Sequence, residues 1–190
     1  MEGLLLAQVL DGLRTRLPAD RLAWRFDGPH TAVLPLVPEG ALWLFDRLPH
    51  PRVEVRDDQP PSGAGPVTGF QALLAARATG PLVGVDQPGL DRVARFRFGP
   101  GTGFVEAEPV ELVAELTGRN GNLILLDRAG VIVGAAREIG ADVNRYREVR
   151  PGLPYVSPPP YEKLDPRDAD AAALRSVLAG RRLRKLRQLV

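Results

Sequence analysis

The chain has 190 residues, of which 44% are hydrophobic and 25% charged, a composition typical of one globular domain with at most a short appendage. It contains no cysteine, which excludes disulfides, thiolate metal sites and thiol catalysis. The formal net charge is +2, but residues 171–190 carry basic side chains and no acidic ones, so the rest of the chain is mildly acidic.

The N-terminus shows no targeting signal. No basic segment precedes the apolar run that starts at Leu4, and Asp11 interrupts that run early. We therefore expect neither a signal peptide nor a membrane span, and we expect a cytoplasmic protein.

The first half of the chain predicts one helix, several short strands and a second helix. Apolar residues at helical spacing predict a helix over residues 3–16, which Pro18 ends. Strand-like segments follow at short intervals, at 21–26, 32–36, 41–46 and 51–55. The first two connections, Gly28-Pro29 and Pro38-Glu39-Gly40, are typical of hairpin turns. After a proline- and glycine-rich loop, an alanine-rich stretch at 67–79 predicts the second helix.

The second half predicts a run of antiparallel strands. They are expected at 82–86, 91–98, 103–108, 110–116, 122–127 and 131–137. Asn120-Gly121 predicts a tight type I′ hairpin turn, in which both residues have positive φ. Many short strands with two helices indicate an α+β fold, with a β-sandwich or barrel of short antiparallel strands flanked by helices.

The segment from Glu138 to Pro160 is expected to be irregular. Its five prolines, at 151, 154, 158, 159 and 160, leave too few backbone donors for it to join a sheet. We expect an extended strap in polyproline geometry that either packs on the domain or presents side chains. Within it, Asn144-Arg145-Tyr146-Arg147 forms a basic and aromatic cluster.

The tail that follows the strap is expected to be helical. Asp165 is a suitable N-cap with Pro166 at the first helical position, and residues 171–178 are expected to form a helix. A basic segment at 181–190 carries leucines that need a partner. We therefore expect a domain at 1–165 and a basic helical segment at 166–190 that leads into a following domain.

Side chains for catalysis are scarce. The two histidines, His30 and His50, lie in proline-rich turns without an acidic neighbour at ligand spacing, so we interpret both as loop residues. The sequence has no P-loop, no GxGxxG fingerprint and no serine in a nucleophile elbow. We therefore expect no cofactor, no metal and no catalytic residue.

Four segments carry a family resemblance in their order along the chain. They are MEGLLL at 1–6, QPGLDR at 87–92, ELTGRNGNLILLD at 115–127 and the stretch from NRYR to the last strap proline at 144–160. Together they resemble the N-terminal (NFACT-N) domain of the RqcH, NEMF and fibronectin-binding protein A-like (FbpA) family. The second helix departs from the family pattern, because Leu73-Leu74 is followed by two alanines in place of a basic pair.

The resemblance implies a module of ribosome-associated quality control. Such proteins bind the large ribosomal subunit that carries a stalled peptidyl-tRNA. They recruit tRNA, alanine tRNA in bacteria, for template-free addition of C-terminal residues, and the peptidyl transfer belongs to the ribosome. Their fold is similar to the N-terminal domain of formamidopyrimidine-DNA glycosylases, whose N-terminal proline nucleophile is absent here, where Met1 and Glu2 begin the chain.

The resemblance also places candidate tRNA contacts. Asp91 and Arg92 fall on the family's Asp-Arg pair, which is implicated in tRNA binding. We also expect contacts from Arg119, Arg145 and Arg147, because arginine makes forked contacts to phosphate and stacks on bases.

Other polar residues of these motifs have simpler interpretations. We interpret Tyr146 as packing the strap onto the sheet rather than stacking on a base. Asn144 is expected to bond loop amides, and Asn122 is interpreted as a residue that the backbone of the hairpin turn favours. The basic residues near the C-terminus are candidates for an rRNA contact, with the solvated face of a following helix as the alternative; they are Arg181, Arg182, Arg184 and Lys185.

Two alternative functions stay open. One is a surface adhesin that binds fibronectin, as the family's older name suggests. The other is a nucleic-acid-binding domain related to the glycosylases but without catalytic activity. The mildly acidic body predicts weak RNA affinity for the isolated domain, with the remaining domains of the same protein supplying most of it.

Overall fold

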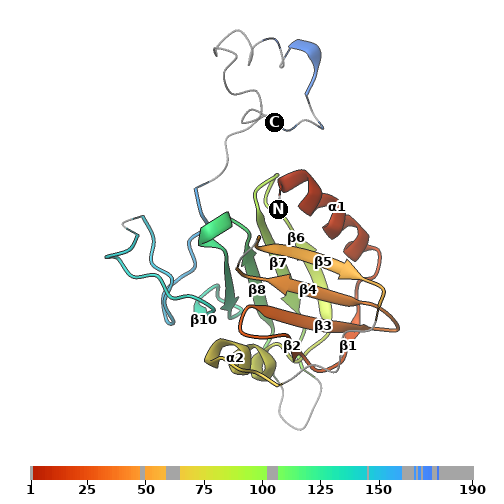
Figure 1. The fold of residues 1–190 in the computed structure, drawn as a ribbon, viewed down its shortest axis with the longest axis vertical. Helices are drawn as coiled ribbons and strands as arrows, with labels where there is room; N and C mark the ends of the chain where they lie inside the picture. The colour runs from red at the N-terminus through yellow and green to blue at the C-terminus, as the bar shows by residue number, and fades with distance from the viewer. Residues whose placement is uncertain are drawn as a thin grey trace.

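A computed structural model describes residues 2–47, 50–58, 65–101, 107–144 and 146–159, together with 165, 167, 169–172 and 175. Within these residues the chain forms two five-stranded antiparallel sheets and two helices (Figure 1). The predicted α+β class is therefore confirmed. None of the described helices is long and apolar enough to cross a membrane.

The first sheet follows helix α1 and is built around strand β3. The elements in chain order are α1 (Gly3–Arg14), β1 (Asp20–Arg21), β2 (Arg25–Phe26), β3 (Thr31–Val37), β4 (Ala41–Phe45) and β5 (Arg52–Arg56). Strands β1 and β2 pair with different parts of β3, which pairs with β4, and β4 pairs with β5. The single strand expected at 21–26 is two short strands, because Trp24 between them enters the core, where its Nε1 donates to the Ala78 carbonyl at 3.0 Å. Both predicted hairpin turns are confirmed, with Gly28 and Gly40 at positive φ.

The second sheet is a meander whose strands pair in chain order. Its elements and the helix before it are α2 (Gly69–Arg77), β6 (Leu82–Asp86), β7 (Val93–Phe98), β8 (Val110–Glu115), the 3-10 turn η1 (Gly118–Asn120), β9 (Asn122–Leu126) and β10 (Ile132–Ala135). The hydroxyl of Thr68 accepts from the Gln71 amide at 3.1 Å and so begins α2. The strand expected at 103–108 falls largely on residues 102–106, which lie outside the described residues.

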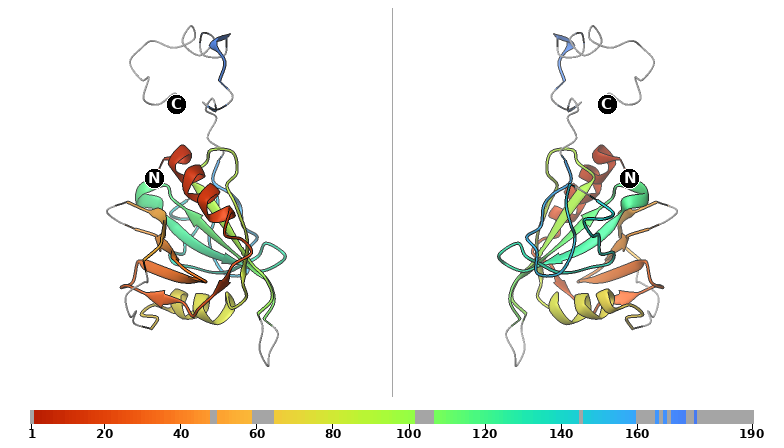
Figure 2. Two further views of the ribbon diagram at one scale, coloured as in Figure 1. Left: turned by 90° about the vertical axis from the view of Figure 1, so that its right-hand side faces the viewer. Right: turned by 90° about the vertical axis from the view of Figure 1, so that its left-hand side faces the viewer.

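The two sheets face one another across one hydrophobic core, and α1 and α2 close it on opposite sides (Figure 2). Fully buried side chains come from both sheets and both helices; they include Phe26, Leu34, Leu42 and Leu44 of the first sheet, Phe96, Phe98, Leu112 and Leu125 of the second, and Leu6, Leu10, Leu13 and Leu74 of the helices. This agrees with the expected sandwich of short strands flanked by helices. The likeness to the glycosylase domain stays a prediction.

The connection between β8 and β9 differs from the predicted type I′ turn. Six residues separate Glu115 from its partner Asn122, and the chain passes through η1 instead of a two-residue turn. Positive φ falls on Gly118, at 67°, whereas Gly121 has φ of −54°. The prediction was wrong because the β8–β9 ladder ends at the pair Glu115–Asn122. Asn120 and Gly121 therefore belong to a six-residue connection and not to a two-residue turn.

The proline-rich strap (residues 138–160) forms no helix or strand among its described residues and packs on the second sheet. It covers the edge of β10 through three backbone hydrogen bonds, from Ile132 to Leu153, from Gly152 to Ile132 and from Tyr155 to Gly130, at 2.8–2.9 Å. We expected too few donors for such pairing, but Gly152 and Tyr155, placed between prolines, supply them. The strap also contributes Ile139 and Val149 to a second apolar cluster on the outer face of the sheet.

Little of the tail falls within the described residues. The Asp165 carboxylate accepts from the Arg167 amide at 2.9 Å, but residue 167 lies in a turn and residues 169 and 170 are not helical. The described helical residues are 171, 172 and 175, so the N-cap expected at Asp165 is not confirmed. Arg181, Arg182, Arg184 and Lys185 lie outside the described residues, so the rRNA contact and the division of the chain at residue 165 stay predictions.

Removing a core ring tests whether the two sheets share one core. Phe96 is 0% exposed between the sheets, so Phe96→Ala is expected to lower the free energy of unfolding by about 3–5 kcal/mol in urea denaturation. Val83→Ala on the neighbouring strand is the control, because Val83 is 46% exposed and its truncation is expected to cost less than about 1 kcal/mol. Equal losses for the two variants would contradict the shared core.

Candidate functional site

Three of the predicted contact residues lie at the same end of the second sheet. Asp91 and Arg92 enter β7, and the amide of Leu116 donates to the Arg92 carbonyl at 2.7 Å, which extends the β7–β8 ladder by one residue. Arg119 lies in η1, directly after the end of β8, and its side chain is exposed. The fold therefore brings Asp91, Arg92 and Arg119, which are distant in the sequence, to one end of one sheet.

The β6–β7 turn that carries Asp91 is fixed against the start of α1. The side-chain amide of Gln87 donates both to the Gly3 carbonyl, at 3.0 Å, and to the Asp91 carbonyl, at 2.7 Å. A Cβ on Gly3 would lie 2.0 Å from the Leu90 carbonyl oxygen, so only glycine allows this approach. The first two motifs of the sequence, MEGLLL and QPGLDR, are thus parts of one contact. The backbone of Asp91 and Arg92 is held in place by a helix end as well as by its own strand.

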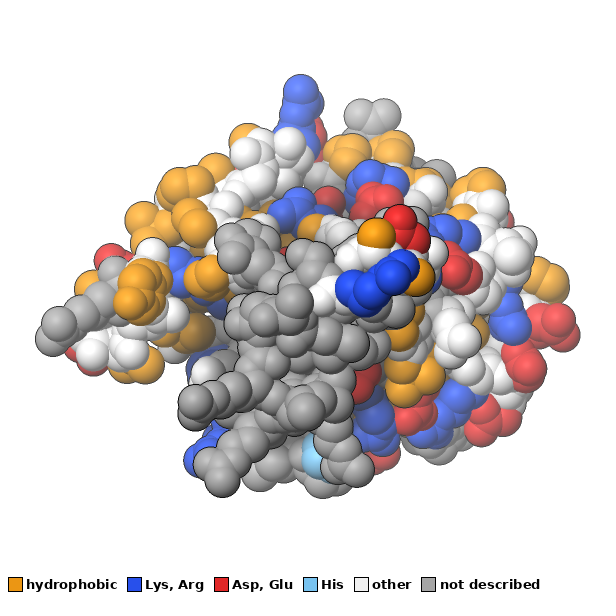
Figure 3. Space-filling model, turned by 90° about the horizontal axis from the view of Figure 1, so that it is seen from above, with side chains coloured by type: hydrophobic (Ala, Val, Ile, Leu, Met, Phe, Trp, Pro, Cys, Tyr) orange, Lys and Arg blue, Asp and Glu red, His pale blue; other side chains and the backbone are white. Residues whose placement is uncertain are grey.

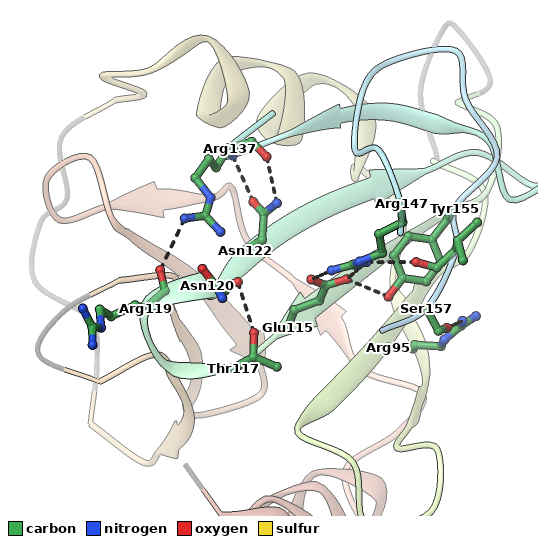
Figure 4. Close-up of polar contacts among 11 residues, drawn as sticks. Arg95, Glu115, Thr117, Arg119, Asn120, Asn122, Arg137, Arg147, Tyr155 and Ser157 are labelled. Carbon is green, nitrogen blue, oxygen red and sulfur yellow. Dashed lines mark hydrogen bonds and ion pairs between the residues drawn. The ribbon is translucent and has the colours of Figure 1, made fainter. Parts of the chain in front are cut away.

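The η1 turn is fixed against the first sheet in a similar way. A Cβ on Gly121 would lie 2.6 Å from the Asp46 carbonyl oxygen and 2.6 Å from Cγ of Pro51, in the connection between β4 and β5. Within the turn, the Thr117 hydroxyl donates to the Asn120 carbonyl at 3.1 Å. The backbone of Arg119 is therefore anchored, while its guanidinium extends outward (Figure 4).

Asn122 has a structural role that differs in detail from the one expected. Its side chain is 1% exposed, and its amide group exchanges two hydrogen bonds with the backbone of Arg137, at 2.8 and 2.9 Å. Arg137 in turn donates from Nη1 to the Arg119 carbonyl at 3.3 Å. Asn122 thus ties the chain after β10 to the start of β9, and it places the exposed Arg137 beside Arg119 (Figure 4).

A buried ion pair anchors the strap to the same end of the sheet. The Glu115 carboxylate, whose side chain is 0% exposed, accepts two hydrogen bonds from Arg147, at 2.6 and 2.5 Å, and one from the Tyr155 hydroxyl, at 2.9 Å (Figure 4). Arg147 also donates to the Val156 carbonyl at 2.9 Å. Sequence reasoning missed this cluster; its one signal was an acidic residue at the end of the apolar run Val110–Leu116.

The electrostatics of this cluster favour the paired state. Burial acts to lower the pKa of Arg147, but the hydrogen bonds and charge of Glu115 more than offset it and raise that pKa above its ordinary value. Burial raises the pKa of the Tyr155 hydroxyl, and the charge of Glu115 raises it further, so Tyr155 stays a neutral donor at physiological pH. The Glu115 carboxylate thus accepts from three donors, as a stable buried pair requires.

The structure separates the residues of the NRYR cluster by role. Arg147 has a side chain only 9% exposed, which donates to Glu115 and to the Val156 carbonyl, and its tRNA contact stays a prediction. Tyr146, expected to pack on the sheet, is instead 91% exposed, and that interpretation was wrong. Asn144 satisfies a loop amide as expected, accepting from the Tyr146 amide at 2.9 Å. Arg145 lies outside the described residues, and its tRNA contact stays a prediction.

The fold gives His30 an acidic partner that its sequence neighbours do not. His30 Nδ1 lies 3.0 Å from a carboxylate oxygen of Asp46, at the end of β4. Burial raises the pKa of Asp46, and the histidine partly opposes that shift. The described residues contain no group of three or more side chains suited to holding a metal ion.

A cleft of about 620 Å³ lies on the outer face of the second sheet, where the strap residue Tyr155 forms part of its wall. Its two central arginines are already paired, Arg95 with Glu111 at 3.0 Å and Arg97 with Asp86 at 2.6 Å. Paired guanidinium groups offer little free positive charge to a polyanion. We therefore place the candidate site at the end of the sheet, not in this cleft.

The sequence of this chain is similar to a known protein family and to individual members of it. The profile of the family described as NFACT N-terminal and middle domains matches residues 44–189. The Rqc2 homolog RqcH of Bacillus subtilis is 34% identical over 86 residues, which are 45% of this chain and 15% of that protein. The Rqc2 homolog RqcH of Streptococcus suis is 32% identical over 73 residues, 38% of this chain and 13% of that protein. The matched segments thus span a small part of either relative.

Two solved structures share the fold. The N-terminal domain of the fibronectin-binding protein PavA from Streptococcus pneumoniae has a TM-score of 0.78 at 20% identity, over 96% of this chain and 74% of that one. The N-terminal part of the fibronectin/fibrinogen-binding protein FBPS from Streptococcus suis has a TM-score of 0.81 at 22% identity, over 100% of this chain and 73% of that one. At these identities the likeness is one of fold.

The buried ion pair can be tested by removing its negative charge while keeping its shape. Glu115→Gln leaves Arg147 charged and buried without a counter-charge, so we expect a loss of about 3–5 kcal/mol in the free energy of unfolding. The matched control is Glu111→Gln on the same strand, whose pair with Arg95 is partly exposed and is expected to contribute about 1 kcal/mol or less. Similar losses of unfolding free energy for the two variants in urea denaturation would contradict a larger contribution from the buried Glu115 pair.

The contact between α1 and the β6–β7 turn can be tested at Gly3. Gly3→Ala places a methyl group against the Leu90 carbonyl, so we expect a loss of roughly 1–3 kcal/mol in the free energy of unfolding and faster amide hydrogen exchange in residues 87–92. Gly12→Ala in the same helix is the control, because no atom lies within 4 Å of the added Cβ and alanine favours helix by up to about 1 kcal/mol. Unchanged exchange in the Gly3 variant would contradict the anchoring of the turn.

Proposed function

The chain belongs to the family of NFACT N-terminal and middle domains, and on this basis we propose that it is the tRNA-recognition and ribosome-binding module of a bacterial ribosome-associated quality-control factor. In this proposal the protein binds large ribosomal subunits that still hold peptidyl-tRNA and recruits tRNA, alanine tRNA by family resemblance, for template-free tailing of the stalled chain. The cytoplasmic location follows from the ribosomal partner. The module binds and positions tRNA, and the ribosome carries out the peptidyl transfer.

The observation that supports the proposal is that Asp91, Arg92 and the exposed Arg119 extend from anchored backbone at the same end of the second sheet. A guanidinium donates in a fork to phosphate or to a base edge, and a carboxylate accepts from a base amine, so the pair suits a nucleotide that presents both. Because these turns are held on a rigid scaffold, they keep this geometry, and binding does not cost the conformational entropy of ordering them. The similarity of the sequence to RqcH proteins supports the same assignment.

The charge of the domain limits how strongly it binds RNA alone. Nucleic-acid affinity rises with the number of phosphates neutralised, and the body of this chain is mildly acidic. We therefore propose that the module selects and orients tRNA, while the remaining domains of the protein supply most of the affinity.

The alternatives have less support. The fibronectin-binding proteins PavA and FBPS resemble this chain in fold only, at 20% and 22% identity, and no observation on the described residues favours fibronectin as a partner. The kinship with DNA glycosylases rests on the expected fold likeness alone. Tight binding of fibronectin by the purified protein would favour the adhesin, and covalent trapping of DNA would favour a glycosylase.

Substitution at the sheet end tests the proposal directly. Asp91→Ala and Arg92→Ala, separately and together, are expected to abolish co-purification of tRNA with the full natural protein and to abolish tail synthesis, with an unchanged thermal melt. Arg128→Ala is the matched control, because Arg128 is an exposed arginine in the β9–β10 turn, at the opposite end of the same sheet. Wild-type levels of tRNA in a folded double variant would move recognition to other domains.

A further inference from the structure

Tyr146 is an aromatic side chain held out in solvent. It is 91% exposed, and the nearby Val143 is 76% exposed. The segment that carries them leaves the sheet and projects from the body, as both the front and side views show (Figures 1 and 2). Seen from above, hydrophobic side chains gather on this projection (Figure 3). A ring this exposed is accessible to a ligand that stacks on it.

Hydrogen bonds hold described residues of the loop that carries Tyr146, namely Ile139, Asn144, Arg147 and Val149. Backbone hydrogen bonds between Ile139 and Val149, at 2.8 and 2.9 Å, close the base of the loop. Before the tyrosine, the Asn144 amide donates to the Gly140 carbonyl at 3.0 Å, and the Asn144 side chain accepts from the Tyr146 amide. After it, Arg147 is locked onto Glu115.

The loop is bound to the sheet end that carries the candidate site through the residue next to Tyr146. Arg147 follows Tyr146 directly, so their Cα atoms are about 3.8 Å apart. Arg147 contacts Glu115 at the end of β8, and the cross-strand partner of Glu115 is Val93, the residue after Arg92. The residue directly after Tyr146 is therefore bound to the end of the sheet that carries Asp91, Arg92 and Arg119.

We propose that Tyr146 stacks on an unpaired base of the RNA whose backbone or base edges contact Arg92 and Arg119. This inference rests on the proposed function and names a further contact of the same site. A phenol ring with both faces open matches the π-face that every base offers, whereas a base inside a duplex is already stacked. The side chains of Asp142 and Glu148 flank the tip, and their carboxylates repel phosphate, so the contact is with the face of a base and not with the RNA backbone.

The test compares Tyr146→Ala and Tyr146→Phe in the full natural protein, with Val143→Ala as a neighbouring control. The probes are unfractionated tRNA and a fully paired RNA duplex of 12 base pairs. Tyr146→Ala is expected to weaken tRNA binding roughly ten-fold or more and to leave duplex binding unchanged. Tyr146→Phe and Val143→Ala are expected to bind tRNA as the wild type does. All three variants are expected to melt normally, because both positions are exposed.

Each other outcome identifies what fails. If the wild type binds tRNA and Tyr146→Ala binds it equally well, the stacking inference is wrong and the proposed function stands. Loss of binding in Tyr146→Phe as well would overturn stacking in favour of a hydroxyl contact. A Tyr146→Ala variant that keeps tRNA but loses fibronectin binding would assign the ring to a protein partner and overturn the inference. A wild type that binds no tRNA would overturn the proposed function and this inference together.

Discussion

The buried pair of Glu115 and Arg147 is the interaction on which the outer half of the domain depends. A carboxylate with no exposed surface is stable only if its lost hydration is replaced, and here two guanidinium bonds and one phenol bond replace it. All three donors come from the strap. The charge on β8 therefore requires the strap to lie in one position, and in that position Ile139 and Val149 cover the apolar outer face of the sheet.

The same end of the sheet is fixed by two close approaches that only glycine permits. Gly3 lets the start of α1 touch the β6–β7 turn, and Gly121 lets the β8–β9 turn touch the first sheet. One contact binds the turn to a helix and the other joins the two layers of the sandwich. The candidate contact side chains thus extend from backbone that is held from behind, which preserves their spacing.

Periodic segments of the sequence predicted the fold well, and irregular segments did not. The apolar spacing of α1 and the alternation along β6 to β10 gave their positions within a few residues, and the family motifs predicted the family. On the strap, no period indicates which side chain turns inward, so Tyr146 was wrongly expected to pack on the sheet, and the burial of Arg147 against Glu115 was not foreseen. Glu115 pairs with Arg147, which lies 32 residues further along the chain, and Asp46 pairs with His30, which lies 16 residues before it. Contacts between residues this far apart in the sequence form only when the chain folds. The tRNA contacts themselves rest on family resemblance and stay proposals.

The hydrogen bonds from the strap to β10 have a consequence for synthesis of the protein. They are the last to form, because the meander ends at Ala135 while Tyr155 and Val156 are made some twenty residues later. At typical elongation rates the nascent chain spends roughly one to four seconds with a finished sheet whose edge is unpaired and whose outer apolar face is bare. An open edge of this kind invites pairing with a neighbouring chain. The strap therefore acts as the closing step of folding, and a chain cut short before Tyr155 is expected to self-associate through β10.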